Sequence, residues 1–204
     1  MLKIKNNVTN TIIIDKSKFI TTLFRVETVE EIQEILASTR KKYYDATHNC
    51  YAYIINDGNN QKCSDDGEPS KTAGSPMLDS LKKNNLTDIL AITTRYFGGI
   101  KLGAGGLIRA YSSSVSEAIK LASLIETKTL AIYNVEIDYS TYNRLTDFLS
   151  KYLIKNTDYA SNITVSVALF DEEIDNFLEQ IKNLTFGKAS INFIENSTID
   201  CDVN

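Results

Sequence analysis

The chain has 204 residues, of which 43% are hydrophobic and 24% charged, and its formal net charge is −4. This composition is typical of a soluble globular protein, and the length suits one large domain or two small ones. No apolar run approaches the roughly 18 residues of a membrane span, and the polar N-terminus is unlike a signal peptide. The three cysteines match neither a disulfide framework nor a zinc-binding pattern. We therefore expect a cytoplasmic protein with no membrane association and no cofactor.

The first half of the chain alternates strand and helix patterns. Thr28 is a good N-cap, and Glu31 stands three residues later at the position of a capping box. Apolar residues at helical spacing follow, which predicts a helix. Runs rich in β-branched and aromatic residues predict strands. The expected elements are a strand at 17–26, a helix at 29–42, a strand at 49–55, a hairpin partner at 61–64, a helix from Pro76 to about 83, a strand at 89–94 and a helix from about 103 to 124.

The second half differs in charge and in element order. Residues 1–126 carry 16 Lys and Arg against 14 Asp and Glu, whereas residues 127–204 carry 6 against 12. This shift predicts two domains, 1–126 and 127–204. The second reads as strand 130–139, helix 141–151, strand 152–160, strand 163–170, helix 172–184 and strand 187–196. That βαββαβ order predicts a ferredoxin-like sandwich.

The glycines and prolines are concentrated in one part of the chain. Eight of the nine glycines and both prolines fall between Gly58 and Gly106. Glycine is unfavourable in regular structure unless the backbone needs a positive φ or close approach to another group. These residues bracket two polar runs, 64–76 and 95–109, where we look for function.

The run 95–109 has the composition of an anion-binding loop. It joins a predicted strand to a predicted helix, and the free N–H groups of a first helical turn bind anions. The spacing matches neither the dinucleotide-binding pattern nor the P-loop. Tight turns and close helix–sheet packing are an equally good explanation of the glycines. An exposed Tyr96 beside Arg95 would suit base stacking. The candidate binding residues are Arg95, Tyr96, Gly98, Gly99, Lys101, Gly103, Gly105, Gly106 and Arg109.

The run 64–76 supplies carboxylates and hydroxyls. Its acids are hard-metal ligands by type, but their spacing is not that of an EF-hand loop, and a lone acidic loop is usually solvated. A triad of His48, Cys63 and Asp65 lacks the sequence context of a nucleophile. We expect no metal and no catalytic residue here. The candidate binding residues of this run are Asp65, Asp66, Glu68, Ser70 and Lys71.

Several motifs together resemble the IMPACT/YigZ family of translation-associated proteins, in its bacterial two-domain form. They are Lys18-Phe19, the run from His48 to Tyr53, Ser64 to Pro69 with Gly74 to Pro76, and the run from Thr94 to Tyr111. The resemblance covers residues from about 15 to 125 by motif and the remainder by element order. It implies an α+β protein whose first domain is like domain 2 of ribosomal protein S-five, with a left-handed βαβ crossover. The second domain would resemble the last domain of elongation factor G.

The resemblance implies a binding role in translation and carries no catalytic residue to this chain. The leading hypothesis is a non-enzymatic protein that engages RNA, the ribosome or a translation-linked partner through the Gly-rich basic loop. One alternative is an enzyme that holds a phosphate or nucleotide at the same helix N-terminus, which rests on fold analogy. Another is a pure protein-interaction module whose acidic second domain docks a basic partner.

Overall fold

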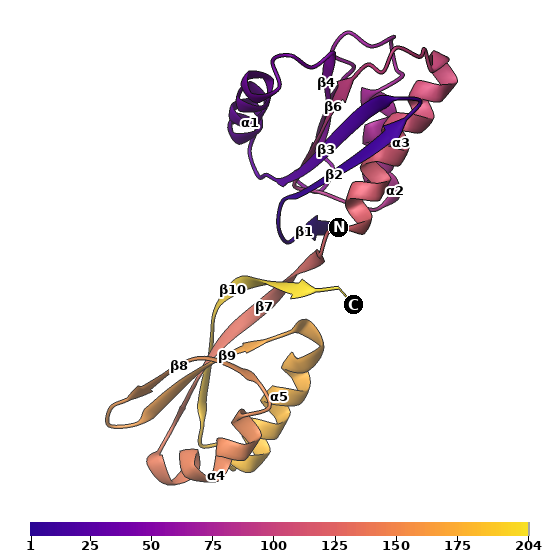
Figure 1. Ribbon diagram of the computed structural model, residues 1–204. Coiled ribbons are helices and arrows are strands. Elements are labelled where there is room, and N and C mark those ends of the chain that lie inside the picture. Colours follow the sequence, from indigo (N-terminus) through magenta and orange to yellow (C-terminus); the bar gives the residue numbers. More distant parts are fainter. Residues whose placement is uncertain (204) are drawn as a thin grey trace. The chain divides into compact units, whose positions relative to one another are not determined.

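The computed structural model describes residues 1–203, which form an α+β protein of two compact units (Figure 1). The first unit comprises residues 1–126 with the C-terminal residues from Asp202, and the second comprises Thr127–Cys201. No helix in the described chain combines the length and the apolar character that a membrane crossing requires.

The first unit is built on a five-stranded antiparallel sheet in the order β2-β3-β6-β4-β5. Both neighbours of β6 run antiparallel to it, so β3 and β4 are parallel to each other and are joined through α1. The strands are β2 (Val8–Ile14), β3 (Ser17–Arg25), β4 (His48–Ile55), β5 (Asn60–Ser64) and β6 (Ile89–Tyr96), and the helices are α1 (Val29–Lys42), α2 (Gly74–Lys83) and α3 (Gly103–Lys120).

Helices cover the two faces of this sheet unequally (Figure 1). The larger apolar cluster lies between the sheet and the pair α2 and α3, and includes Phe19, Leu81 and Tyr111. A smaller cluster on the other face lies under α1, around Ile32 and Ile92. Side chains along β6 alternate between these two cores, as the period of a strand requires.

Local sequence signals explain where α1 begins and ends. Thr28 accepts a hydrogen bond from the backbone N–H of Glu31 at 3.2 Å, as an N-cap residue does. The last turn is basic, which suits the negative end of the helix dipole. The predicted bounds of this helix, 29–42, are confirmed.

The predicted bounds fail near both ends of the first unit. Strands β1 (Leu2–Ile4) and β2 were not predicted. The helix predicted to run to 124 ends at Lys120, and β7 (Leu124–Ile137) begins four residues later. Leu124 fits the helical pattern, but it pairs with Ile4 of β1. A tertiary strand pairing has overridden the local periodicity.

The second unit has the predicted ferredoxin-like fold. Its elements are β7 from Thr127 onward, α4 (Tyr139–Leu149), β8 (Leu153–Tyr159), β9 (Ile163–Leu169), α5 (Asp171–Leu184) and β10 (Ser190–Asp202). The strand order is β10-β7-β9-β8, so the two central strands are the first and third of the βαββαβ unit. An apolar cluster that includes Val135, Phe148 and Phe177 holds the helices to the sheet.

Candidate functional site

Glu68 and Arg95 form a buried ion pair that connects the two glycine-bearing runs. Only 8% of Glu68 and 4% of Arg95 are exposed. Nη1 of Arg95 lies 2.6 Å from Oε1 of Glu68, and the Tyr111 hydroxyl donates to the same oxygen at 2.8 Å. Nη2 of Arg95 donates to Ser17 Oγ at 3.2 Å. One carboxylate therefore joins the loop 64–76 to β6 and to α3.

Aromatic rings pack against the Arg95 guanidinium. Its central carbon lies 5.3 Å from the ring centroid of Phe19 and 5.6 Å from that of Phe97. Such cation–π contacts favour a charge that has been removed from water. The guanidinium is thus held in place by a carboxylate, a hydroxyl and two rings, and only its Nε lacks a hydrogen-bond partner among the described residues.

This burial corrects the predicted composition of the basic surface. We expected Arg95 to bind a ligand together with Lys101 and Arg109. The structure instead places Arg95 in the interior, where its charge is matched by Glu68. Glu68 is likewise unavailable as an exposed ligand. Neither residue contributes to an exposed binding surface in this structure.

Asp65 organises the loop after β5 through its carboxylate. Oδ1 accepts from the backbone N–H groups of Ala73 at 3.0 Å and Gly74 at 2.8 Å, and Oδ2 accepts from that of Lys71 at 2.8 Å. Gly74 packs so closely that an added Cβ would lie 2.7 Å from the backbone nitrogen of Ser64. Asp65 is therefore engaged with the protein backbone.

Asp66 and His48 hold the same loop to the start of β4. Oδ2 of Asp66 accepts from the backbone N–H of Asn49 at 2.6 Å. His48 donates through Nδ1 to the Asp66 carbonyl at 2.8 Å, and its Nε2 lies 3.7 Å from Oε2 of Glu68. The histidine contacts this loop backbone and Glu68. Within the described residues no cluster of three His, Cys, Asp or Glu side chains is placed to hold a metal ion.

Cys50 lies behind this network in an environment that keeps its thiol neutral. Its Sγ is 2.9 Å from the Asp65 carbonyl oxygen and 3.4 Å from the Tyr111 hydroxyl. Burial raises the pKa of the Cys50 thiol to about 12. Burial also raises the pKa of Tyr111 far above its ordinary value, with the neighbouring thiol and carboxylate acting in the same direction. Both groups are therefore poor nucleophiles near neutral pH.

The glycines of the run 95–109 divide into two kinds. A Cβ on Gly98 would lie 2.0 Å from the backbone carbon of Lys16, so this glycine allows two segments of backbone to pack together. Gly99 and Gly103 have φ of +85° and +70°, and no heavy atom would lie within 4 Å of an added Cβ. Gly105 also faces open surroundings, with only Arg109 Nη1 at 3.6 Å, whereas Gly106 packs against Leu102.

The loop between β6 and α3 exposes both apolar and basic side chains. Phe97 is 46% exposed and Ile100 is 43% exposed. Lys101 and Arg109 are exposed, and within residues 1–203 neither forms an ion pair with a carboxylate. The N-cap residue of α3 is Leu102, whose side chain has no acceptor for the first N–H groups.

The remaining predicted residues lie at the edges of this region. Tyr96 is half-buried and donates from its hydroxyl to Asp45 Oδ1 at 2.8 Å, and that hydrogen bond raises the pKa of the Tyr96 phenol. Ser70 and Lys71 are exposed on the loop 64–76. Sequence reasoning missed the roles of Ser17 and Tyr111. Ser17 stands between two lysines at the start of β3, and neither residue carries a local signal for its contact with the buried pair.

Replacing Arg95 with methionine is expected to destabilise the protein by about 3–5 kcal/mol, because the Glu68 carboxylate would stay buried without its partner. Denaturant unfolding measures this change. Arg109→Met removes an exposed arginine and is the matched control, with an expected change within about 0.5 kcal/mol. Adding Glu68→Gln to Arg95→Met should recover part of the loss. A cost below about 1 kcal/mol for Arg95→Met would show that the pair does not organise the site.

Cys50 is expected to resist thiol reagents in the folded protein, since the reactive thiolate is suppressed by burial. Ellman's reagent at pH 8 should titrate Cys63 and Cys201, both half-buried, and should reach Cys50 only in denaturant. Cys50→Ala should leave the native thiol count unchanged. Three rapidly reacting thiols in the native protein would contradict the buried environment.

Two family models match the chain in the order of its two units. The Impact N-terminal domain matches residues 15–119, and a domain of unknown function, DUF1949, matches residues 135–188. The first match contains both glycine-bearing runs and every residue of the Glu68–Arg95 network.

Whole-chain relatives agree with these matches. The chain is 44% identical to IMPACT family member YvyE of Bacillus subtilis, over 95% of this chain and 90% of that protein. It is 33% identical to IMPACT family member YigZ of Escherichia coli, over 89% and 92%. A crystal structure of a hypothetical protein aligns with a TM-score of 0.60 at 32% identity, covering 95% of this chain and 97% of that one. The chain therefore belongs to the IMPACT family.

Proposed function

We propose that this protein is a translation-associated binding protein that contacts RNA, free or within the ribosome, through the loop between β6 and α3. Membership of the IMPACT family supports the translation-linked role that the sequence motifs imply. The observation that carries the choice of surface is the pair Lys101 and Arg109, two exposed cations without carboxylate partners in the described residues, beside the uncapped N-terminus of α3.

Three features of this loop suit a phosphate backbone. The first N–H groups of α3 and the positive end of its dipole favour an anion. Gly99 and Gly103 leave open space where a side chain would stand. The exposed ring of Phe97 offers a surface on which an unpaired base can stack. With Arg95 withdrawn into the core, two cations remain, so we expect modest affinity and a shallow salt dependence.

A protein partner is the second candidate for the same loop. Phe97, Ile100 and, on α3, Ile108 are exposed apolar side chains. Exposed apolar side chains next to charged ones are common in protein interfaces. This candidate predicts binding that changes little with salt and is lost when Phe97 and Ile100 become polar.

Charge reversal of Lys101 and Arg109 should weaken RNA binding and reduce its dependence on salt. Fluorescence anisotropy with labelled single-stranded and duplex RNA, at low and physiological salt, gives both quantities. If each cation contacts one phosphate, the slope of log affinity against log salt should fall by about 0.7 per residue lost for a single strand. Lys151 and Lys155, reversed together in the second unit, form the charge-matched control.

If RNA binding persists after charge reversal of Lys101 and Arg109, the loop between β6 and α3 is not part of the RNA interface. Absence of binding to either form of RNA would reject the proposal and favour the protein partner. In that case a Phe97→Ser/Ile100→Ser variant and the wild type, each used to capture ribosomal particles at physiological salt, would test the apolar contact.

Gly105→Ala is expected to separate stability from binding. Gly105 lies in the first turn of α3 with an ordinary negative φ and room for a methyl group. Alanine at a helical glycine should raise stability by up to about 1 kcal/mol. If RNA approaches the backbone here, the same methyl group should lower affinity. Thermal unfolding and anisotropy on one preparation measure both, and higher stability with unchanged affinity would show that the ligand does not reach this turn.

A further inference from the structure

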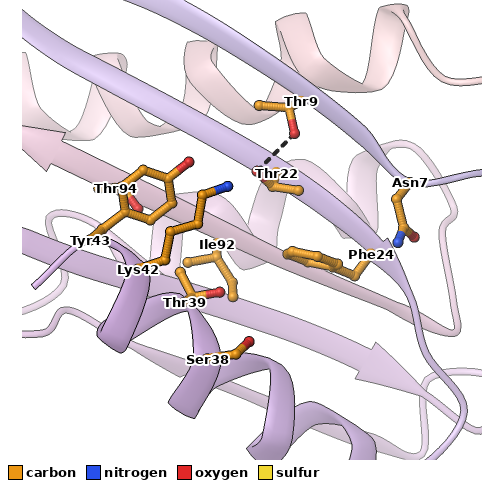
Figure 2. Close-up of a pocket in the computed structure, with 10 residues that line it drawn as sticks. All are labelled: Asn7, Thr9, Thr22, Phe24, Ser38, Thr39, Lys42, Tyr43, Ile92 and Thr94. Carbon is orange, nitrogen blue, oxygen red and sulfur yellow. Dashed lines mark hydrogen bonds between the residues drawn. The ribbon is translucent and has the colours of Figure 1, made fainter.

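A groove of about 550 Å³ lies on the face of the first-unit sheet that α1 covers only in part (Figure 2). The helix packs over β4 and β6, and the strands β2 and β3 extend beyond it. The groove is bounded by the C-terminal half of α1 on one side and by the strands on the other. Its volume falls within the range of sites that hold small organic ligands.

The floor of the groove is apolar. Figure 2 shows Phe24 of β3 and Ile92 of β6 lying along the sheet beneath the groove. Both side chains belong to the apolar cluster under α1, so packing holds them in place. Ile92 is only 2% exposed, so the half-buried ring of Phe24 is the apolar surface open to a planar ligand group.

The rim of the groove carries neutral hydrogen-bonding groups. Asn7 uses its side-chain oxygen to accept from the backbone N–H of Arg25 at 2.9 Å, which directs its amide N–H₂ elsewhere. Thr9 and Thr22 share one hydrogen bond at 3.0 Å, and Thr94 donates to Asn49 Oδ1 at 2.7 Å. The hydroxyls of Thr9 and Thr22 retain unused capacity, whereas Thr94 is buried with its hydroxyl bonded to Asn49. The rim therefore offers both donors and acceptors to a ligand with polar edges.

A single charge stands over the groove. Lys42 is its only charged lining residue among those described, and its ammonium lies 5.0 Å from the ring centroid of Tyr43. Figure 2 shows the Lys42 nitrogen directed across the groove toward Thr22. With Arg40 and Lys41, it forms a basic last turn that offsets the negative end of the α1 dipole. One positive charge at the groove suits a ligand that carries one anionic group.

We propose that this groove binds a ribonucleoside monophosphate unit, free or as one residue of single-stranded RNA. The base lies on Phe24, the ribose hydroxyls and base edge meet the polar rim, and the phosphate meets Lys42. The groove and the loop between β6 and α3 are different surfaces. The inference therefore does not depend on the proposed function, although an RNA that engages the loop could also fill the groove.

Calorimetric titration of the full-length chain tests the proposal with four probes: adenosine 5′-monophosphate, adenosine, ribose 5-phosphate and a short single-stranded oligoadenylate. We expect saturable binding of the monophosphate and weaker binding of adenosine and of ribose 5-phosphate. Tighter binding of the oligonucleotide than of the monophosphate would identify single-stranded RNA as the physiological source, and weaker binding would identify the free nucleotide. Lys42→Gln should weaken binding of the monophosphate by about tenfold, the loss expected for one charge-assisted hydrogen bond. Amide resonances of Thr22 and Thr94 should shift during the same titration.

The matched control is Lys41→Gln, an equal change of charge at the neighbouring exposed position that does not line the groove. Equal losses of affinity for the monophosphate in the two variants would overturn the proposal. The losses would then reflect only the general electrostatic field of the protein and not a contact with Lys42. Equal affinity for ribose 5-phosphate and the monophosphate would overturn the placement of the base. Absence of binding to all four probes would overturn the site. Charge reversal of Lys101 and Arg109 should leave binding of the monophosphate intact, which separates this test from that of the loop.

Discussion

The buried pair of Glu68 and Arg95 is the constraint on which the arrangement of the first unit depends. A charge withdrawn from water must be matched, because an unpaired ion in the interior is strongly unfavourable. Glu68 comes from an irregular loop, Arg95 from the sheet, and Tyr111 from α3, so satisfying one carboxylate fixes three segments relative to one another. Asp65 then ties the rest of the loop to its own backbone. The loop owes its order to these polar contacts more than to apolar packing.

In the glycine-rich run 95–109, some glycines allow close packing of the backbone and others shape an exposed loop. Gly98, two residues beyond β6, allows the chain to pass close to the turn between β2 and β3. Its N–H donates to Ser17 Oγ at 3.2 Å, the hydroxyl that also accepts from Arg95. Gly99 and Gly103 are different, since their positive φ values shape a loop with open space around it. A structural and a binding explanation of the glycines are thus compatible, because they apply to different positions.

The sequence predicted elements whose signals are local and missed features that depend on tertiary contacts. Thr28 and the apolar spacing that follows placed α1 correctly, and runs rich in β-branched and aromatic residues placed the main strands of the first unit. The strand β1 has three residues, and its partner Leu124 imitates a helical position, so neither could be recognised without the fold. Arg95 was misread for the same reason. A basic residue at the end of a strand, three residues before Gly98, resembles an exposed one until the carboxylate 27 residues earlier is brought to 2.6 Å from it.

The period of a single strand explains why the two faces of the sheet carry different polar groups. Along β6, Thr93 faces the α3 side, where it bonds to Thr21, while Thr94 lines the groove beside α1. Arg95 returns to the α3 side. The register of β6 with β3 and β4 therefore decides which face of the sheet each residue occupies. A shift by one residue would put Arg95 on the groove side and Thr94 against Glu68. Because the Glu68–Arg95 pair penalises that shift, the interaction that orders the loop also maintains the composition of the groove on the opposite face.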